Sequence, residues 1–85
     1  MRTPITLPEL GLPEERRITL SVWYAGPGEL VFEGDRLIEV LTDGATFDVP
    51  SPASGVLVEW RAYPRDVLWP GQVLGVVEAA EGDTR

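Results

Sequence analysis

The chain has 85 residues, a net charge of −7, and no cysteine, histidine or lysine, so all seven basic residues are arginines. These absences exclude disulfides and thiol chemistry, the usual general base and metal ligand, and any lysine-linked prosthetic group, leaving only the N-terminal amine. The negative charge argues against nucleic acid and anionic membranes as partners, and it suits a basic protein surface.

Length and hydrophobic content are those of one small globular domain. A hydrophobic fraction of 44% allows a packed core, and we place the domain at residues 1–80 with a frayed tail at residues 81–85. No apolar run is long enough to span a membrane, and the N-terminus lacks the apolar core of a signal peptide. We therefore expect a cytoplasmic protein.

Glycines and prolines interrupt the chain so often that no helical period is visible, and the pieces between them have the composition of strands. Strict alternation in the second piece predicts one face with Ile18, Leu20, Val22 and Tyr24, and an opposite face with Thr19, Ser21 and Trp23. Short strands at this spacing predict an all-β sandwich or barrel. The predicted strands are 3–7, 17–24, 36–42, 45–49, 55–61 and 72–78.

An internal repeat supports this architecture. Residues 18–40 align with residues 55–77 at a shift of 37, with seven identities in 23 positions. The identical pairs include Trp23 with Trp60. Two similar halves indicate quasi-twofold packing of two sheets, since a solenoid needs three or more repeats.

Asp43-Gly44 separates two predicted strands and is a strong hairpin signal, because a type I′ turn requires positive φ at both central residues. We take Thr42 and Ala45 as the flanking positions of the turn. This choice fixes three cross-strand pairs: Val40 with Phe47, Ile38 with Val49, and Glu39 with Asp48.

The opposed carboxylates of Glu39 and Asp48 repel each other, so their face of the hairpin should be solvated. Leu37 has the wrong parity for the opposite, buried face. A bulge near Gly34-Asp35 would correct that parity.

Residues spread over nearly the whole chain resemble the signature of lipoyl carrier domains. The start of the chain resembles the lipoyl domains of dihydrolipoyl acyltransferases, and the central motif surrounds the predicted turn. The matching residues are Leu7-Pro8-Glu9-Leu10-Gly11, then Trp23 and Gly28-Glu29, then Gly34-Asp35 with Leu37 and Glu39, then Thr42-Asp43 and Ala45, then Val49-Pro50-Ser51-Pro52 and Gly55, and finally Asp66-Val67, Gly71-Gln72 and Leu74.

The resemblance implies a flattened β-barrel, a barrel-sandwich hybrid of two four-stranded antiparallel sheets with quasi-twofold symmetry. It also implies a lipoyl lysine at the tip of the hairpin, exposed to the ligase and to successive active sites. Asp43 before this position and Ala45 after it point to lipoyl rather than biotinyl attachment.

The chain departs from the family pattern in ways that affect function. Gly44 occupies the position of the lipoyl lysine, and glycine has no amine to form an amide with lipoate. Leu41 replaces a family glutamate, and Arg65 replaces a family glycine after Pro64, so the second loop should be stiffer.

Two functional hypotheses follow. The first is a stand-alone, unmodified interaction module, whose partners would be 2-oxo acid dehydrogenase components or the lipoyl ligase. The second is a genuine swinging-arm carrier from which the lysine has been lost by an introduced change or by drift. Neither predicts catalytic or metal-binding residues. The chain has no linker and no acyltransferase domain, so we do not expect it to be the acyltransferase itself.

The side chains considered as partner contacts lie around the hairpin and the first loop. They are Glu39, Leu41, Leu10 and Leu12. For Leu41 the structural alternative is packing under the Leu10-Gly11-Leu12 loop. We expect the three tryptophans, Trp23, Trp60 and Trp69, to pack in the core or at its boundary.

Overall fold

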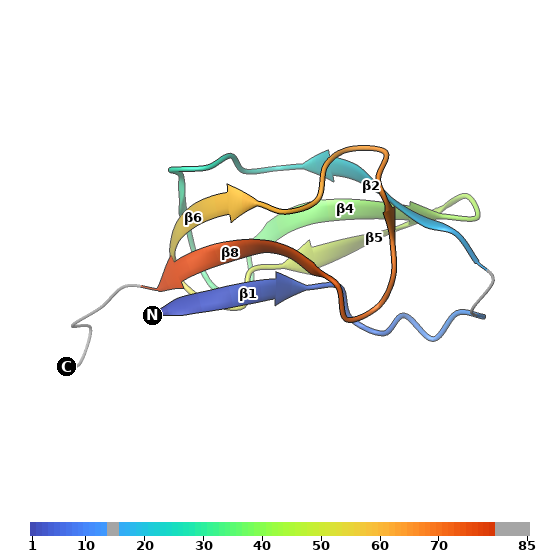
Figure 1. The fold of residues 1–85 in the computed structure, drawn as a ribbon, viewed down its shortest axis with the longest axis horizontal. Coiled ribbons are helices and arrows are strands. Elements are labelled where there is room, and N and C mark those ends of the chain that lie inside the picture. The colour runs from blue at the N-terminus through green and yellow to red at the C-terminus, as the bar shows by residue number, and fades with distance from the viewer. Residues whose placement is uncertain (14–15, 80–85) are drawn as a thin grey trace.

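The computed structural model describes residues 1–13 and 16–79, so the predicted tail at 81–85 lies outside the described part. Eight strands and no helix occur there (Figure 1). They form two four-stranded antiparallel sheets, ordered β1-β8-β6-β3 and β5-β4-β2-β7. The strands are β1 (Arg2–Thr6), β2 (Ile18–Trp23), β3 (Leu30–Val31), β4 (Arg36–Thr42), β5 (Ala45–Pro50), β6 (Gly55–Trp60), β7 (Val67–Leu68) and β8 (Val73–Ala79).

The predicted all-β fold and quasi-twofold arrangement are confirmed. Adding 37 to the bounds of β2, β3 and β4 gives the bounds of β6, β7 and β8. The partners also correspond, because β4 lies between β2 and β5 while β8 lies between β6 and β1. The alternation pattern missed β3 and β7, which have two residues each and are too short to show a period.

The predicted faces of β2 are wrong beyond Leu20. Leu20 pairs with Val40 and Val22 pairs with Glu39, so Ser21 is an extra residue in a β-bulge. The bulge reverses the alternation. Val22 and Tyr24 therefore point outward and are exposed, while Trp23 packs against the core.

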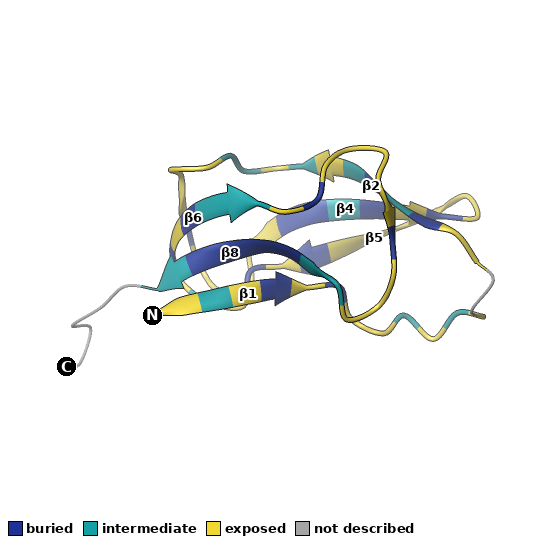
Figure 2. Cartoon of the chain, viewed as in Figure 1, coloured by how far each residue is buried: buried dark blue, intermediate teal, exposed yellow. Residues whose placement is uncertain are grey.

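Leu37 is buried by a bulge, but not by the one predicted near Gly34-Asp35. Arg36 pairs with Pro50 and Ile38 pairs with Val49, which leaves Leu37 itself as the extra residue. Leu37 and Ile38 are both fully buried as a result. Figure 2 shows β4 as mostly buried with an intermediate stretch in its middle, in contrast to the exposed hairpin tip beyond it.

Trp23 and Trp60 join the two halves. Their rings stack with centroids 5.1 Å apart and an interplanar angle of 7°. Trp23 Nε1 donates to the carbonyl oxygen of Ala62 at 2.9 Å, and Trp60 Nε1 donates to that of Ala25 at 3.0 Å. The prediction of boundary packing is thus correct for these two rings, but it is wrong for Trp69, which is 61% exposed.

Arg65 differs in one respect from its counterpart in the other half, Gly28. The backbone amide of Gly28 donates to the Leu57 carbonyl, and that of Arg65 donates to the Leu20 carbonyl, both at 2.8 Å. Both residues have positive φ, 94° for Gly28 and 79° for Arg65. Glycine adopts this conformation freely, whereas a residue with a Cβ is strained in it.

We expect Arg65→Gly to raise the free energy of unfolding by roughly 0.5–1 kcal/mol, because relief of strain exceeds the entropy that glycine adds to the unfolded chain. The melting temperature should rise by about 2–8 °C. Gly28→Ala, at the equivalent position, should lower it. A lower melting temperature for Arg65→Gly would show that the arginine side chain stabilises the loop by more than its backbone strain costs.

Candidate functional site

The tip of the β4–β5 hairpin lies at the end of the molecule opposite the N-terminus (Figure 1). The predicted pairs Val40 with Phe47 and Glu39 with Asp48 are present, and Thr42 pairs with Ala45. This register leaves only Asp43 and Gly44 in the turn.

Asp43 has a φ of 51° and Gly44 a φ of 82°. Positive φ at both central residues is the backbone requirement of a type I′ turn, as the sequence predicted. A Cβ built on Gly44 would have no neighbour within 4 Å. Backbone conformation, and not crowding, therefore makes this position suited to glycine.

A segment distant in sequence contacts the tip. Arg16 Nη1 donates to Asp43 Oδ2 and forms an ion pair with it. The contact connects the segment between β1 and β2 to the turn. Arg16 was not among the residues predicted from the sequence, because no local pattern relates two residues that are 27 positions apart.

Thr42 is only 3% exposed, and its Oγ1 is the one buried side-chain nitrogen or oxygen atom in the described residues that lacks a hydrogen-bond partner. An unpaired buried hydroxyl destabilises the folded state, since it loses its hydrogen bonds to water. The base of the turn therefore contains a polar group that the surrounding structure does not satisfy.

Leu41 lies on the outer face of its sheet and is 40% exposed. It pairs with Thr46 on β5 and with Thr19 on β2. A side chain this exposed is not covered by the Leu10-Gly11-Leu12 loop, so burial under that loop is not observed. The counterpart of Leu41 in the other half is Glu78, which receives a 3.1 Å hydrogen bond from Arg2.

Glu39 lies opposite Asp48 on the same outer face, and each carboxylate has a partner. The Tyr24 hydroxyl donates to Glu39 at 3.0 Å, and this hydrogen bond to a carboxylate raises the pKa of Tyr24 above its ordinary value. Arg36 Nη1 lies 3.5 Å from Asp48 Oδ2. These partners reduce the repulsion expected from the sequence.

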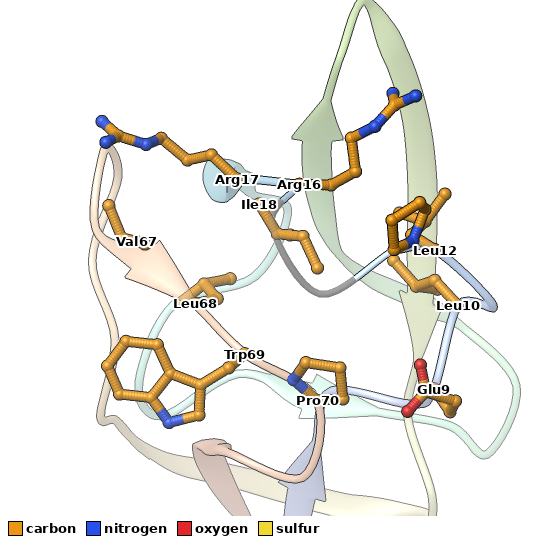
Figure 3. Close-up of a pocket in the computed structure, with 11 residues that line it drawn as sticks. Glu9, Leu10, Leu12, Arg16, Arg17, Ile18, Val67, Leu68, Trp69 and Pro70 are labelled. Carbon is orange, nitrogen blue, oxygen red and sulfur yellow. The ribbon is translucent and has the colours of Figure 1, made fainter.

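An open groove with a volume of about 780 Å³ lies between the first loop and β7 (Figure 3). Buried Ile18 and Leu68 line it together with Leu10 and Leu12, which pack against the core. Arg16, Arg17 and Trp69 line it as well. Leu10 and Leu12 were predicted as contacts from the sequence, whereas the two arginines and Trp69 were not.

Neither a metal site nor a membrane-crossing helix is found in residues 1–13 and 16–79. No group of three or more metal-ligating side chains gathers there. No helix there is long and apolar enough to cross a bilayer.

Comparisons with known proteins agree with this fold. Residues 3–77 match the Biotin_lipoyl family, described as "Biotin-requiring enzyme". The lipoyl domain of the 2-oxoglutarate dehydrogenase complex from Azotobacter vinelandii superimposes with a TM-score of 0.68 and 27% identity, covering 89% of this chain and 99% of that domain. The chain therefore belongs to the biotin/lipoyl family, and the resemblance to lipoyl domains is confirmed.

Curated relatives are acyltransferase components of multienzyme complexes. The succinyltransferase component of the 2-oxoglutarate dehydrogenase complex from Bartonella vinsonii subsp. berkhoffii is 38% identical over 79 residues, 93% of this chain and 19% of that protein. The acetyltransferase component of the pyruvate dehydrogenase complex from Corynebacterium glutamicum is 31% identical over 81 residues, 95% of this chain and 12% of that protein. The chain thus spans less than a fifth of the length of these two relatives.

We expect Gly44→Ala to lower the free energy of unfolding by about 1 kcal/mol, because alanine would be forced into positive φ. The melting temperature should fall by about 4–8 °C. Gly26→Ala is the matched control: Gly26 has no positive φ, and its Cβ would also meet nothing within 4 Å. Equal melting temperatures for the two variants would contradict a turn that depends on glycine.

Replacing Thr42 by valine removes the unsatisfied hydroxyl and keeps the shape of the side chain. We expect Thr42→Val to raise the free energy of unfolding by up to about 1 kcal/mol in chemical denaturation. Thr42→Ser keeps the hydroxyl and loses a methyl group, so it should lower that free energy by about 0.8 kcal/mol. Destabilisation by valine would indicate that the hydroxyl has a hydrogen-bond partner in solution.

Proposed function

We propose that this chain is an unmodified, non-catalytic interaction module of a lipoate-dependent, 2-oxo acid dehydrogenase type complex in the cytoplasm. The observation that carries the proposal is the Asp43-Gly44 tip, where the family resemblance places the lipoyl lysine. Lipoate is attached through an amide, which needs an amine nucleophile. The tip offers none, and the sequence contains no lysine at all.

The backbone conformation at the tip favours glycine at position 44. A lysine at position 44 would have to adopt the φ of 82° that glycine has there, or the turn would have to change. A side chain with a Cβ is strained in that region by about 1–2 kcal/mol. This strain favours glycine at the turn, and it is the lack of a side-chain amine that makes the residues present unfit for a covalent lipoyl group.

The choice of partner follows the relatives, whose names place them in 2-oxoglutarate and pyruvate dehydrogenase complexes. We propose dehydrogenase components of such a complex, or the lipoyl ligase, as proteins that contact the hairpin end. Leu41 and Glu39 on the outer face and Leu10 and Leu12 at the first loop are the proposed contacts. Leu41 is the apolar member exposed beside the tip.

Intact mass spectrometry after co-expression with an active lipoyl ligase, in medium containing lipoate, tests the absence of modification. We expect the unmodified mass for the natural chain. Gly44→Lys should be lipoylated slowly, and the double variant Gly44→Lys, Leu41→Glu should be lipoylated faster, because it restores the glutamate of the family pattern. A lipoyl or biotinyl mass on the natural chain would overturn the proposal.

Binding to purified dehydrogenase components, measured by surface plasmon resonance, tests the interaction. We expect the natural chain to bind and Leu41→Glu to bind more weakly, because the variant adds charge to an apolar contact. Val56→Glu is a matched control, since Val56 is also 40% exposed but lies on the other sheet. Absence of binding to every component would argue against membership of such a complex.

A further inference from the structure

The arginines of the described residues divide into two groups. Four form an ion pair with a carboxylate: Arg2 with Glu78, Arg16 with Asp43, Arg36 with Asp48, and Arg61 with Glu59. Arg17 and Arg65 form none with any residue in 1–13 and 16–79, and both are exposed. Within the described residues they are positive charges without an ion pair, in a chain whose net charge is −7.

These two arginines lie along the same pair of strands. Arg17 directly precedes β2, whose first residue, Ile18, pairs with Leu68 of β7. The backbone amide of Arg65 donates to the carbonyl of Leu20, two residues further along β2. The short strand β7 therefore has near each end an arginine that forms no ion pair with a described residue.

The backbone of Arg65 is strained, because this residue has a Cβ and a positive φ. Its φ of 79° is one that glycine adopts without strain, and its counterpart Gly28 has the same sign of φ. The side chain is exposed and forms no ion pair in the described residues, so local packing does not explain it. A strained residue that gains no stabilising contact from its own fold indicates a role in binding.

Exposed apolar side chains lie on β7 and directly after it. Val67 is 44% exposed and Trp69 is 61% exposed. Both line the groove, and Figure 3 shows the Arg17 side chain extending on the same side as Val67 and Trp69, across from Leu10 and Leu12. Tryptophan and arginine are the residue types most enriched among energetically dominant interface residues.

The other half of the molecule provides an internal comparison. At a shift of 37, the counterparts of Val67 and Trp69 are Leu30 and Phe32, which are also exposed, at 65% and 57%. The counterparts of Arg17 and Arg65 are Ser54 and Gly28, which carry no charge. Exposed apolar residues thus occur in both halves, while among the described residues arginines without an ion pair accompany them along β2 and β7 and not in the other half.

We propose that the arginine-flanked face, formed by Arg17, Arg65, Val67 and Trp69, docks an acidic segment of a partner protein that also carries apolar side chains. Its carboxylates would pair with the two arginines, and an apolar side chain would enter the groove beside Trp69. The inference rests on the proposed function for the existence of a protein partner, and it adds the chemistry of the segment and its place on the molecule.

The distribution of charge favours an acidic protein segment over other ligands. Glu9 also lines the groove, on the side of the first loop. Arg17 and Arg65, which have no ion pair in the described residues, can neutralise a few carboxylates, whereas nucleic acid requires many phosphate contacts, which a chain of net charge −7 would oppose. Overall charge alone would favour a basic partner. The arginine-flanked face predicts the opposite sign for the segment that binds there.

The test uses the full chain and a fluorescein-labelled peptide that alternates leucine and glutamate, with binding measured by fluorescence anisotropy. We expect saturable binding that weakens as salt is raised. The double variant Arg17→Gln, Arg65→Gln should bind about tenfold more weakly, and Trp69→Ser should lose a similar factor. Phe32→Ser, the matched control in the other half, should bind as the natural chain does.

Arg65→Gly separates binding from folding. It should melt at a higher temperature than the natural chain and still bind the peptide more weakly, which a purely structural role of Arg65 would not produce. A higher melting temperature with unchanged affinity would overturn the role of Arg65 in docking.

Other ligands, measured in the same way, show which class of ligand the face binds. The proposal fails if a leucine–lysine peptide, duplex DNA or anionic vesicles bind as tightly as the leucine–glutamate peptide, or if the double arginine variant binds that peptide unchanged. If the natural chain binds dehydrogenase components but not the leucine–glutamate peptide, this inference is wrong and the proposed function stands. If it binds the peptide but no dehydrogenase component, the proposed function is wrong and the docking chemistry stands.

Discussion

The contact between Trp23 and Trp60 determines how the two halves of this domain fit together. Equivalent residues that touch each other must lie at the pseudo-twofold axis, and the two rings do so, each donating its Nε1 hydrogen to the loop of the opposite half. Both strands carry a bulge two residues before the tryptophan, at Ser21 and at Val58. Without these bulges the alternation of each strand would turn the rings toward solvent. Gly75 leaves room for one ring, since a Cβ there would lie 2.9 Å from Trp23 Cη2.

Because the two halves have the same backbone arrangement, differences between equivalent residues can be compared directly. An ion-paired glutamate, Glu78, corresponds to exposed Leu41 beside the hairpin tip. A glycine, Gly28, corresponds to strained Arg65. The two halves thus share one backbone arrangement but carry different residues at these positions. Both differences lie in or next to the sheet that contains the hairpin, where we propose that partners bind.

Different physical properties characterise the hairpin tip and the arginine-flanked face. At the tip, our proposal of an unmodified domain rests on two residues with positive φ and on the lack of a lysine. Along β7, our proposal of docking rests on exposed apolar area and on arginines that have no ion pair in the described residues. The contact of Arg16 with Asp43 links the segment that borders the groove to the turn. A partner bound in the groove would therefore lie near the tip without needing a group attached to it.

The sequence by itself determined the all-β class, the strands longer than two residues, the repeat at a shift of 37 and the register of the Asp43-Gly44 hairpin. Each depends on local pattern: alternation, glycine and proline positions, or turn chemistry. The faces of β2, the bulge at Leu37, the exposure of Trp69 and the buried hydroxyl of Thr42 appeared only in the tertiary structure. A bulge shifts every side chain beyond it by one position, and burial depends on strands that are distant in sequence. The partners of the arginines were decided in the same way, because ion pairs form between residues that only the folded chain brings together.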